Sequence, residues 1–198
     1  FMNQLTFDEM KNLISATGFN TGAIDVIGKI KQTDADGAGQ LSKGTFWVGA
    51  VLLASTWNVE LAEMQGIMVG NESLFQNVQG WYGPSMNTHR SPFSGRNFEY
   101  YSQDGVQAAK IAAAVVKGAQ SKGVVTYIKH FALNDQEQNR QINGGVITWC
   151  SEQAMRENYL KPFEAAIKEG GANATMGSFN RIGMMPSVNF YDFYVSLT

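Results

Sequence analysis

The sequence predicts an α/β fold, because strand-like and helix-like segments alternate along its 198 residues. Short apolar runs bounded by turn residues are typical of buried parallel strands, and the longer segments between them have helical spacing. In addition, the polar clusters of the chain come directly after strand-like segments. That order is typical of a (β/α) barrel, which carries its active site at the carboxyl ends of the strands, and also of an open doubly wound sheet.

The beginning of the chain differs from this alternation. Thr6 and Glu9 have the spacing of a capping box, so a helix is expected to follow and to run to about Ala16. Residues 20–44 are polar and glycine-rich, and within them the stretch DADGAG at residues 34–39 is expected to form a loop. The segment around Asp36 is a candidate for an additional strand.

Four strands and three helices are expected in the remainder. Asn58 can cap the first of these helices. Residues 87–105 have no clear periodicity, and a loop of this length inside a compact domain is usually functional. The expected strands are residues 48–55, 78–86, 124–128 and 173–179, and the expected helices are residues 59–75, 106–120 and 149–168.

The composition argues against several classes of protein. A net charge of −2 and the lack of a basic run argue against a nucleic-acid-binding protein. The apolar stretches are shorter than the ~20 residues that span a bilayer, so no membrane segment is expected. One cysteine and two histidines cannot form a disulfide framework or a Cys/His metal site. The first residues lack the pattern of a signal peptide, so we expect a cytoplasmic protein.

Two long motifs carry more specific information. One is GPSMNTHRSPFSGRNFEYYS at residues 83–102, and the other is KHFALNDQE at residues 129–137. Together, and in this order, they resemble family 3 glycoside hydrolases, which are typified by β-glucosidases. The stretches ASTWN at residues 54–58 and MGSFNR at residues 176–181 are shorter matches to the same family. The resemblance covers roughly residues 5–183.

The resemblance implies a (β/α)8 TIM barrel rather than a doubly wound sheet. A closed barrel of this kind takes about 250 residues, so residues 1–198 are expected to form a single, partial N-terminal-type barrel domain with about four to five βα units. This domain would end before the strand that carries the family nucleophile. Open strand edges and apolar faces are a liability in solution, so a homo-oligomer, a complementary chain or further sequence downstream is expected to complete the barrel.

The resemblance also implies which residues hold a sugar. Asp36, Arg96, Lys129 and His130 match the family residues that contact hydroxyl groups of the bound sugar. Charged side chains suit this role because they form the stronger, charge-assisted hydrogen bonds. Glu99 is expected to hold Arg96 in place. No metal ion and no organic cofactor is implied.

Each of these residues also has a purely structural interpretation. Arg96 could be an ion-pair partner of Glu99, and His130 could be a hydrogen-bonded core histidine. Lys129 could be a solvated lysine. Asp36 could stabilise a turn through its own side chain. Ala38 stands where the family usually has proline, which leaves the role of Asp36 open.

The sequence does not identify the catalytic residues. Retaining hydrolysis requires two carboxyl groups, one as nucleophile and one as acid/base. In the family the nucleophile is an aspartate on a later strand beside an aromatic residue, and Asp192 in FYDFY is the candidate here. However, the eleven residues between Asn180 and Asp192 are too few for a further helix and strand. Phe179 also departs from the family, in which tyrosine is common at this position.

Two functional hypotheses follow. The first is an enzyme of carbohydrate metabolism that hydrolyses β-glucosides by a retaining mechanism with two carboxylates. The alternative is a non-catalytic carbohydrate-binding or scaffold protein that derives from such a hydrolase. In both cases the expected ligand is a small sugar or a β-glucoside.

Overall fold

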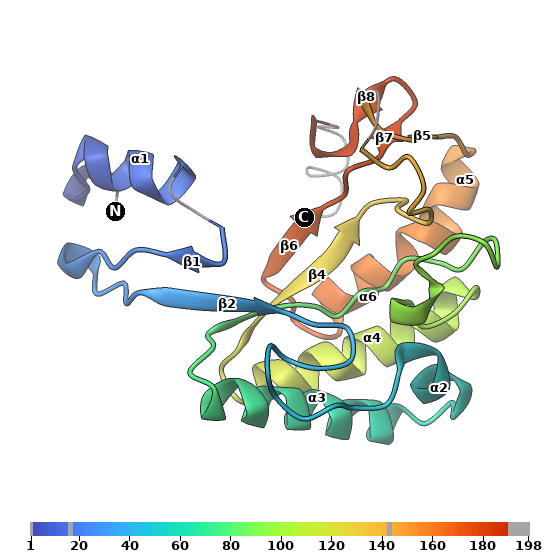
Figure 1. Cartoon of the computed structure of the whole chain (residues 1–198), viewed down its shortest axis with the longest axis horizontal. Coiled ribbons are helices and arrows are strands. Elements are labelled where there is room, and N and C mark those ends of the chain that lie inside the picture. Colours follow the sequence, from blue (N-terminus) through green and yellow to red (C-terminus); the bar gives the residue numbers. More distant parts are fainter. Residues whose placement is uncertain (1, 16–17, 142–143, 190–198) are drawn as a thin grey trace.

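A curved five-stranded sheet forms the centre of the computed structural model, which describes residues 2–15, 18–141 and 144–189 (Figure 1). The first pair of neighbouring strands is antiparallel, and the other neighbours are parallel. The strands lie in the order β1 (Asn20–Thr21), β2 (Gln32–Asp36), β3 (Gly80–Tyr82), β4 (Val125–Phe131) and β6 (Ala174–Gly177).

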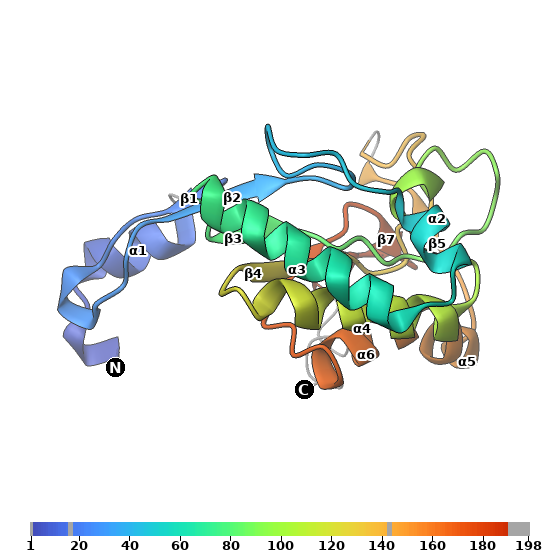
Figure 2. The same ribbon diagram turned by 90° about the horizontal axis from the view of Figure 1, so that it is seen from below.

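The order of the parallel strands distinguishes a barrel from a doubly wound sheet. From β2 to β6, each strand of this sheet pairs with the one that precedes it in the chain. A doubly wound sheet instead reverses direction at a switch point. The helices α3 (Val59–Phe75), α4 (Gly105–Gln120) and α6 (Lys161–Lys168) cover the same face of the sheet (Figure 2). The fold is therefore part of a (β/α) barrel, as the sequence predicts.

The smaller elements lie around this core. Helix α1 (Phe7–Ser15) and β1 extend away from the body of the molecule, whereas a second, three-stranded sheet lies near the carboxyl ends of β4 and β6 (Figure 1). None of the helices in the described ranges is long and apolar enough to cross a membrane. The other elements are α2 (Ala50–Ser55), α5 (Glu152–Ala154), a π-helical turn (Met155–Tyr159), and the strands β5 (Ile147–Thr148), β7 (Arg181–Ile182) and β8 (Met185–Pro186).

Side-chain caps begin α3 and α4. The carboxamide oxygen of Asn58 accepts a hydrogen bond from the Leu61 backbone N–H at 2.9 Å, which confirms the predicted cap of α3. At α4, the Asp104 carboxylate accepts from the backbone N–H groups of Val106 and Gln107, at 2.8 Å each. The buried stripe of α4 then forms much of the core and includes Ala108, Ile111, Ala112, Val115, Val116 and Ala119.

Glycines allow α3 and α4 to approach each other closely. A Cβ atom at Gly66 would lie 2.1 Å from the Val115 carbonyl oxygen. A Cβ atom at Gly118 would lie 2.2 Å from the Glu63 carbonyl oxygen. Both distances are far below a van der Waals contact, so any side chain at these positions would push the two helices apart.

The prediction of a strand at residues 48–55 is wrong, because this run forms α2. Ala50, Leu53 and Ala54 are buried, whereas the side chain of Leu52 is 63% exposed. This spacing of i, i+3 and i+4 places one face of a helix on the core. A short apolar run does not distinguish a strand from a buried helix by itself, which explains the error.

The segment around Asp36 is the additional strand, β2, and the loop expected from Asp34 onward begins only at Gly37. The other three strands of the parallel set are confirmed, although their bounds differ from the expected ones. The partial barrel thus has four parallel strands, and β2 takes the place of the strand wrongly expected at residues 48–55.

The continuous helix expected over residues 149–168 is also wrong. Its helical part begins at Glu152, continues through the π-helical turn, and then resumes as α6. Pro162 lies in the first turn of α6. Proline has no backbone N–H to donate to the preceding turn, so the helix starts anew there.

We predict that Gly66→Ala destabilises the fold by about 1–3 kcal/mol, because the added methyl group clashes with the carbonyl oxygen of Val115. This effect should exceed the gain of about 1 kcal/mol in helix propensity that alanine brings. Urea denaturation followed by circular dichroism measures the difference. Gly22→Ala is the control, because no atom lies within 4 Å of its Cβ position. A Gly66→Ala variant as stable as the parent chain would contradict the close packing.

Candidate functional site

A hollow of about 510 Å³ opens beside the carboxyl ends of the parallel strands. Asp36 is the last residue of β2, and Lys129 and His130 lie near the carboxyl end of β4. Arg96 lies in the loop after β3. The structure therefore brings together all four side chains for which the sequence suggests a sugar-binding role. The hollow is lined by Phe19, Asp36, Gly37, Ala38, Tyr82, Arg96, Phe98, Glu99, Lys129, His130, Arg140, Met176 and Phe179.

Asp36 and Lys129 form an ion pair across β3. The Lys129 ammonium lies 2.5 Å from Asp36 Oδ1, and the lysine itself is only 3% exposed. The same Oδ1 also accepts a hydrogen bond from the Gly37 backbone N–H at 2.8 Å. Asp36 is therefore a turn residue, as its structural interpretation predicts, and also the counter-ion of a buried cation.

The turn after β2 requires its glycine and rests on a tryptophan. A Cβ atom at Gly37 would lie 1.7 Å from the Gln40 carbonyl oxygen. The indole N–H of Trp81 donates to the Gly37 carbonyl oxygen at 2.8 Å. Trp47 packs edge-on against Trp81, with ring centroids 6.2 Å apart. This packing fixes the position from which Asp36 reaches into the hollow.

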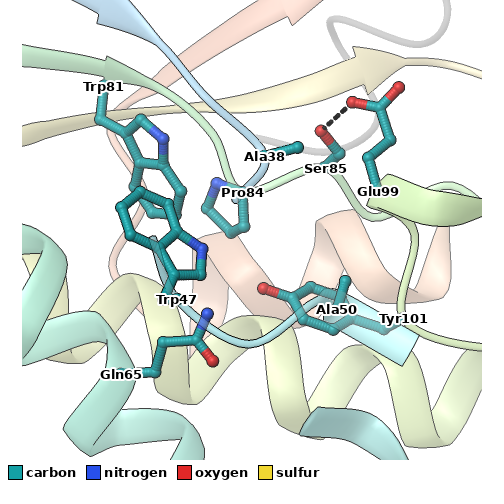
Figure 3. Close-up of a pocket in the computed structure, with 9 residues that line it drawn as sticks. All are labelled: Ala38, Trp47, Ala50, Gln65, Trp81, Pro84, Ser85, Glu99 and Tyr101. Carbon is teal, nitrogen blue, oxygen red and sulfur yellow. Dashed lines mark hydrogen bonds between the residues drawn. The ribbon is translucent and has the colours of Figure 1, made fainter. Parts of the chain in front are cut away.

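A second, small hollow lies beneath this turn, between the sheet and the helices (Figure 3). Trp47 and Trp81 form one side of it, and Ser85 and Glu99 face each other on the other side (Figure 3). The Ser85 hydroxyl donates to Glu99 Oε2 at 2.7 Å. Glu99 lines both hollows. Ser85 anchors its carboxylate on the side of the small hollow, and Arg96 pairs with it on the side of the large one.

Arg96 is held by two carboxylates. One nitrogen of its guanidinium, Nη2, forms an ion pair with Glu99, the partner that the sequence predicts for it. The other, Nη1, donates to Glu137 Oε2 at 2.8 Å. Glu137 also pairs with the Nε of Arg140 at 3.2 Å. Arg96 itself is half-buried in this network, so its guanidinium has a defined orientation.

Glu137 and Arg140 also belong to the site, although the sequence did not predict a role for them. Arg140 lines the hollow, and its guanidinium carbon lies 5.0 Å from the ring centroid of Phe179. Glu137 lies within the KHFALNDQE motif, three residues before Arg140. An acidic and a basic residue three positions apart in the loop after a strand weakly indicate an ion pair near the strand end.

His130 is buried at the bottom of the network, with 5% of its surface exposed. The Asn87 side chain donates to the His130 carbonyl oxygen at 2.9 Å and accepts from its backbone N–H at 2.8 Å. Burial, and then the positive charges of Lys129, Arg96 and Arg140, lower the pKa of the His130 imidazole to about 2. The ring is therefore neutral at physiological pH.

The sequence also singled out Asp192 and Phe179 in connection with the catalytic chemistry. Asp192 lies outside the described residues. Phe179, which stands where the family commonly has tyrosine, borders the hollow beneath Arg140. Among the described residues that line the hollow, the carboxylates are Asp36 and Glu99, and both form ion pairs. The hollow thus offers charged donors and acceptors suited to hydroxyl groups.

A barrel that gathers charged side chains at its strand ends is the arrangement of barrel enzymes. The comparisons with known proteins define the class further. Residues 13–188 match the sequence profile of the glycosyl hydrolase family 3 N-terminal domain, so the chain belongs to glycosyl hydrolase family 3.

Relatives with known names and structures agree with this assignment. The chain is 38% identical over 191 residues to a β-glucosidase of Rhizobium radiobacter, which covers 91% of the chain and 23% of that protein. It is 34% identical over 197 residues to thermostable β-glucosidase B of Acetivibrio thermocellus, covering 91% of the chain and 26% of that protein. The chain thus spans about a quarter of the length of these curated relatives.

Solved structures match the fold over nearly the whole chain. The β-glucosidase 3B of Thermotoga neapolitana in complex with α-D-glucose has a TM-score of 0.85 and 35% identity, over 96% of this chain and 30% of that one. The family 3 β-glucosidase of Bifidobacterium adolescentis has a TM-score of 0.91 and 34% identity, over 98% of this chain and 29% of that one.

We predict that stability falls in acid partly because His130 is buried without charge. An unfolded histidine takes up a proton below a pH of about 6.5, whereas His130 in the fold does so only near pH 2. The unfolded state therefore binds more protons, and the free energy of unfolding decreases as the pH falls, by at most about 1.4 kcal/mol per pH unit.

Urea denaturation of the parent chain and of His130→Asn, at several pH values between about 6.5 and 4.5, measures this contribution. The slope of stability against pH should be shallower in His130→Asn and should be retained in the control His89→Asn. Equal slopes in the parent chain and His130→Asn would show that His130 is already protonated in the fold or accessible to protons.

Proposed function

We propose that this chain is the glucose-binding part of a β-glucosidase that hydrolyses β-glucosides with retention of configuration. The observation that carries the proposal is the convergence of Asp36, Arg96, Lys129 and His130 on one hollow beside the strand ends. A relative of the same family and fold has been solved with α-D-glucose. Both facts support binding of a glucose unit here.

The charges of the hollow suit a pyranose ring. Neighbouring hydroxyl groups of a sugar donate and accept hydrogen bonds in pairs, and charged partners form the stronger bonds. Asp36 offers a carboxylate that is 54% exposed, and Lys129 and Arg96 offer donors beside it. Glu99 and Glu137 hold Arg96 in one orientation, so little side-chain freedom is lost when the sugar binds.

The chemical step requires a nucleophile and an acid/base, which we place outside the described residues. In a retaining mechanism the nucleophile attacks the anomeric carbon and forms a glycosyl–enzyme intermediate, while the acid/base protonates the leaving oxygen. Water then hydrolyses the intermediate, and the acid/base residue now acts as the base. Within this chain, Asp192 is the candidate for the nucleophile.

The alternative proposal is a carbohydrate-binding or scaffold protein without catalysis. It is favoured by the pairing of Asp36 and Glu99, the carboxylates that line the hollow among the described residues, because a paired group is already engaged. Either version recognises the same sugar, so turnover and not binding discriminates between them.

We predict that the chain binds glucose and that Lys129→Met weakens the binding about tenfold to a hundredfold, because a charged hydrogen bond to a hydroxyl group is lost. Isothermal titration calorimetry measures the affinity. Lys117→Met is the matched control, because Lys117 pairs with Glu63 on the outer surface, away from the hollow. An unchanged affinity in Lys129→Met would contradict the proposed site.

Turnover is tested with a nitrophenyl β-glucoside. If Asp192 is the nucleophile, the chain should release nitrophenol, the first sugar product should be the β anomer, and Asp192→Asn should lower the rate about ten-thousand-fold. Asp8→Asn is the control, since the Asp8 side chain is 81% exposed on α1. Glucose binding without turnover would support the non-catalytic alternative.

We also propose that a second copy or a complementary chain completes the barrel. Strand β6 is the last strand of the described sheet and pairs there only with β4, so its other edge offers unpaired backbone groups. Light scattering of the purified chain tests this proposal. A stable monomer across a range of concentrations would exclude self-association.

A further inference from the structure

The hydrogen bonds around His130 determine which of its ring nitrogens carries the proton. Nε2 lies 3.1 Å from Nη2 of Arg96, and Nδ1 lies 3.3 Å from the hydroxyl oxygen of Tyr100. A guanidinium group has donors only and no acceptor. Nε2 must therefore accept, and a neutral ring that accepts at Nε2 carries its proton on Nδ1.

We propose that Tyr100 is a positioning residue that holds His130 in the Nδ1–H tautomer, so that Nε2 is a permanent acceptor beside Arg96. The Tyr100 oxygen accepts from Nδ1–H on this assignment, and its own proton points elsewhere. Tyr100 is fully buried, so this proton needs a partner inside the protein.

Asn134 supplies that partner. Its carboxamide nitrogen is placed 3.4 Å from the Tyr100 oxygen, and its carboxamide oxygen, which is buried, has no hydrogen-bond partner in the described part of the chain. The oxygen and nitrogen of an amide side chain are assigned from their hydrogen bonds. Exchanging the two atoms lets the Tyr100 hydroxyl donate to the Asn134 oxygen, and the carboxamide nitrogen then occupies the position without a partner in the described part of the chain.

Three hydrogen bonds then follow one another. Arg96 donates to His130 Nε2, His130 Nδ1–H donates to the Tyr100 oxygen, and the Tyr100 hydroxyl donates to the Asn134 oxygen. A neutral imidazole with a bare Nε2 orients the guanidinium without adding a positive charge next to Lys129 and Arg140. With the other tautomer, an N–H at Nε2 would face the donors of Arg96 and repel them. Tyr100 thus acts on the sugar site through His130 and Arg96; this consequence rests on the proposed function, whereas the tautomer itself does not.

Long-range ¹H–¹⁵N NMR of the ¹⁵N-labelled chain tests the tautomer directly. The chain has two histidines, so His89→Asn assigns the His130 signals. We expect a protonated, pyrrole-like Nδ1 and an unprotonated, pyridine-like Nε2 at neutral pH. A pyrrole-like Nε2, or two equivalent protonated nitrogens, in the parent chain would overturn the proposal without any variant.

Tyr100→Phe removes the acceptor and tests the role of the hydroxyl group. The Nδ1–H pattern should be lost or mixed in this variant, and glucose affinity should fall about tenfold because a buried N–H is left unpaired. Tyr101→Phe is the control, since Tyr101 is also buried but lines the small hollow beneath the turn. An unchanged His130 tautomer in folded Tyr100→Phe would overturn the proposal.

The two proposals fail in different ways. The expected tautomer in a chain that does not bind glucose would contradict the proposed function and leave the assignment of His130 intact. Glucose binding by a chain with an Nε2–H histidine would do the reverse.

Discussion

The candidate site depends on the balance of charge around the carboxyl end of β4. Lys129 is buried there, and a buried cation without a partner is costly. Asp36 reaches across from β2 to neutralise it, while Glu99 and Glu137 neutralise Arg96. The uncharged imidazole of His130 lies between these cations. Each cation that lines the hollow is thus paired with a carboxylate, which orients the donors before any ligand arrives.

This balance is possible because the parallel register aligns the strand ends. Asp36 pairs with Tyr82 on β3, and Ser85, shortly after β3, bridges to Lys129 on β4. Asp36 and Lys129 therefore lie near the carboxyl ends of β2 and β4, on either side of β3, and the long lysine side chain spans the gap. The close packing of α3 on α4 behind the sheet keeps these strands in place, since α4 is among the most buried elements of the fold.

The charged residues of the hollow come from separate segments of the chain. Asp36 ends β2, Lys129 and His130 lie on β4, and Arg96 lies in the loop after β3. Among the described residues that line the hollow, the carboxylates of Asp36 and Glu99 both form ion pairs. The carboxyl ends of the parallel strands therefore gather donors and acceptors that are distant in the sequence, as in other barrels.

The sequence by itself determined the elements that follow from local chemistry. The cap at Asn58, the alanine-rich helix at residues 106–120 and the β-branched run at residues 124–128 are encoded within a few residues of each other. The family resemblance then predicted a sugar-binding role for Asp36, Arg96, Lys129 and His130, of which the last three lie in the two long motifs. Residues 48–55 show the limit of such reasoning, because a short apolar run is compatible with a strand or a helix and only its neighbours decide.

Only the tertiary structure decided which side chains meet. Glu137 and Arg96 are 41 residues apart in the chain, yet they form an ion pair. The same holds for Asp36 and Lys129, which are 93 residues apart. Local periodicity carries no information on such distances, and neither does it specify the donors around His130 that select its protonated nitrogen. The sequence therefore determined the kinds of groups available, and the packing of the strand ends determined the hydrogen-bond roles of each.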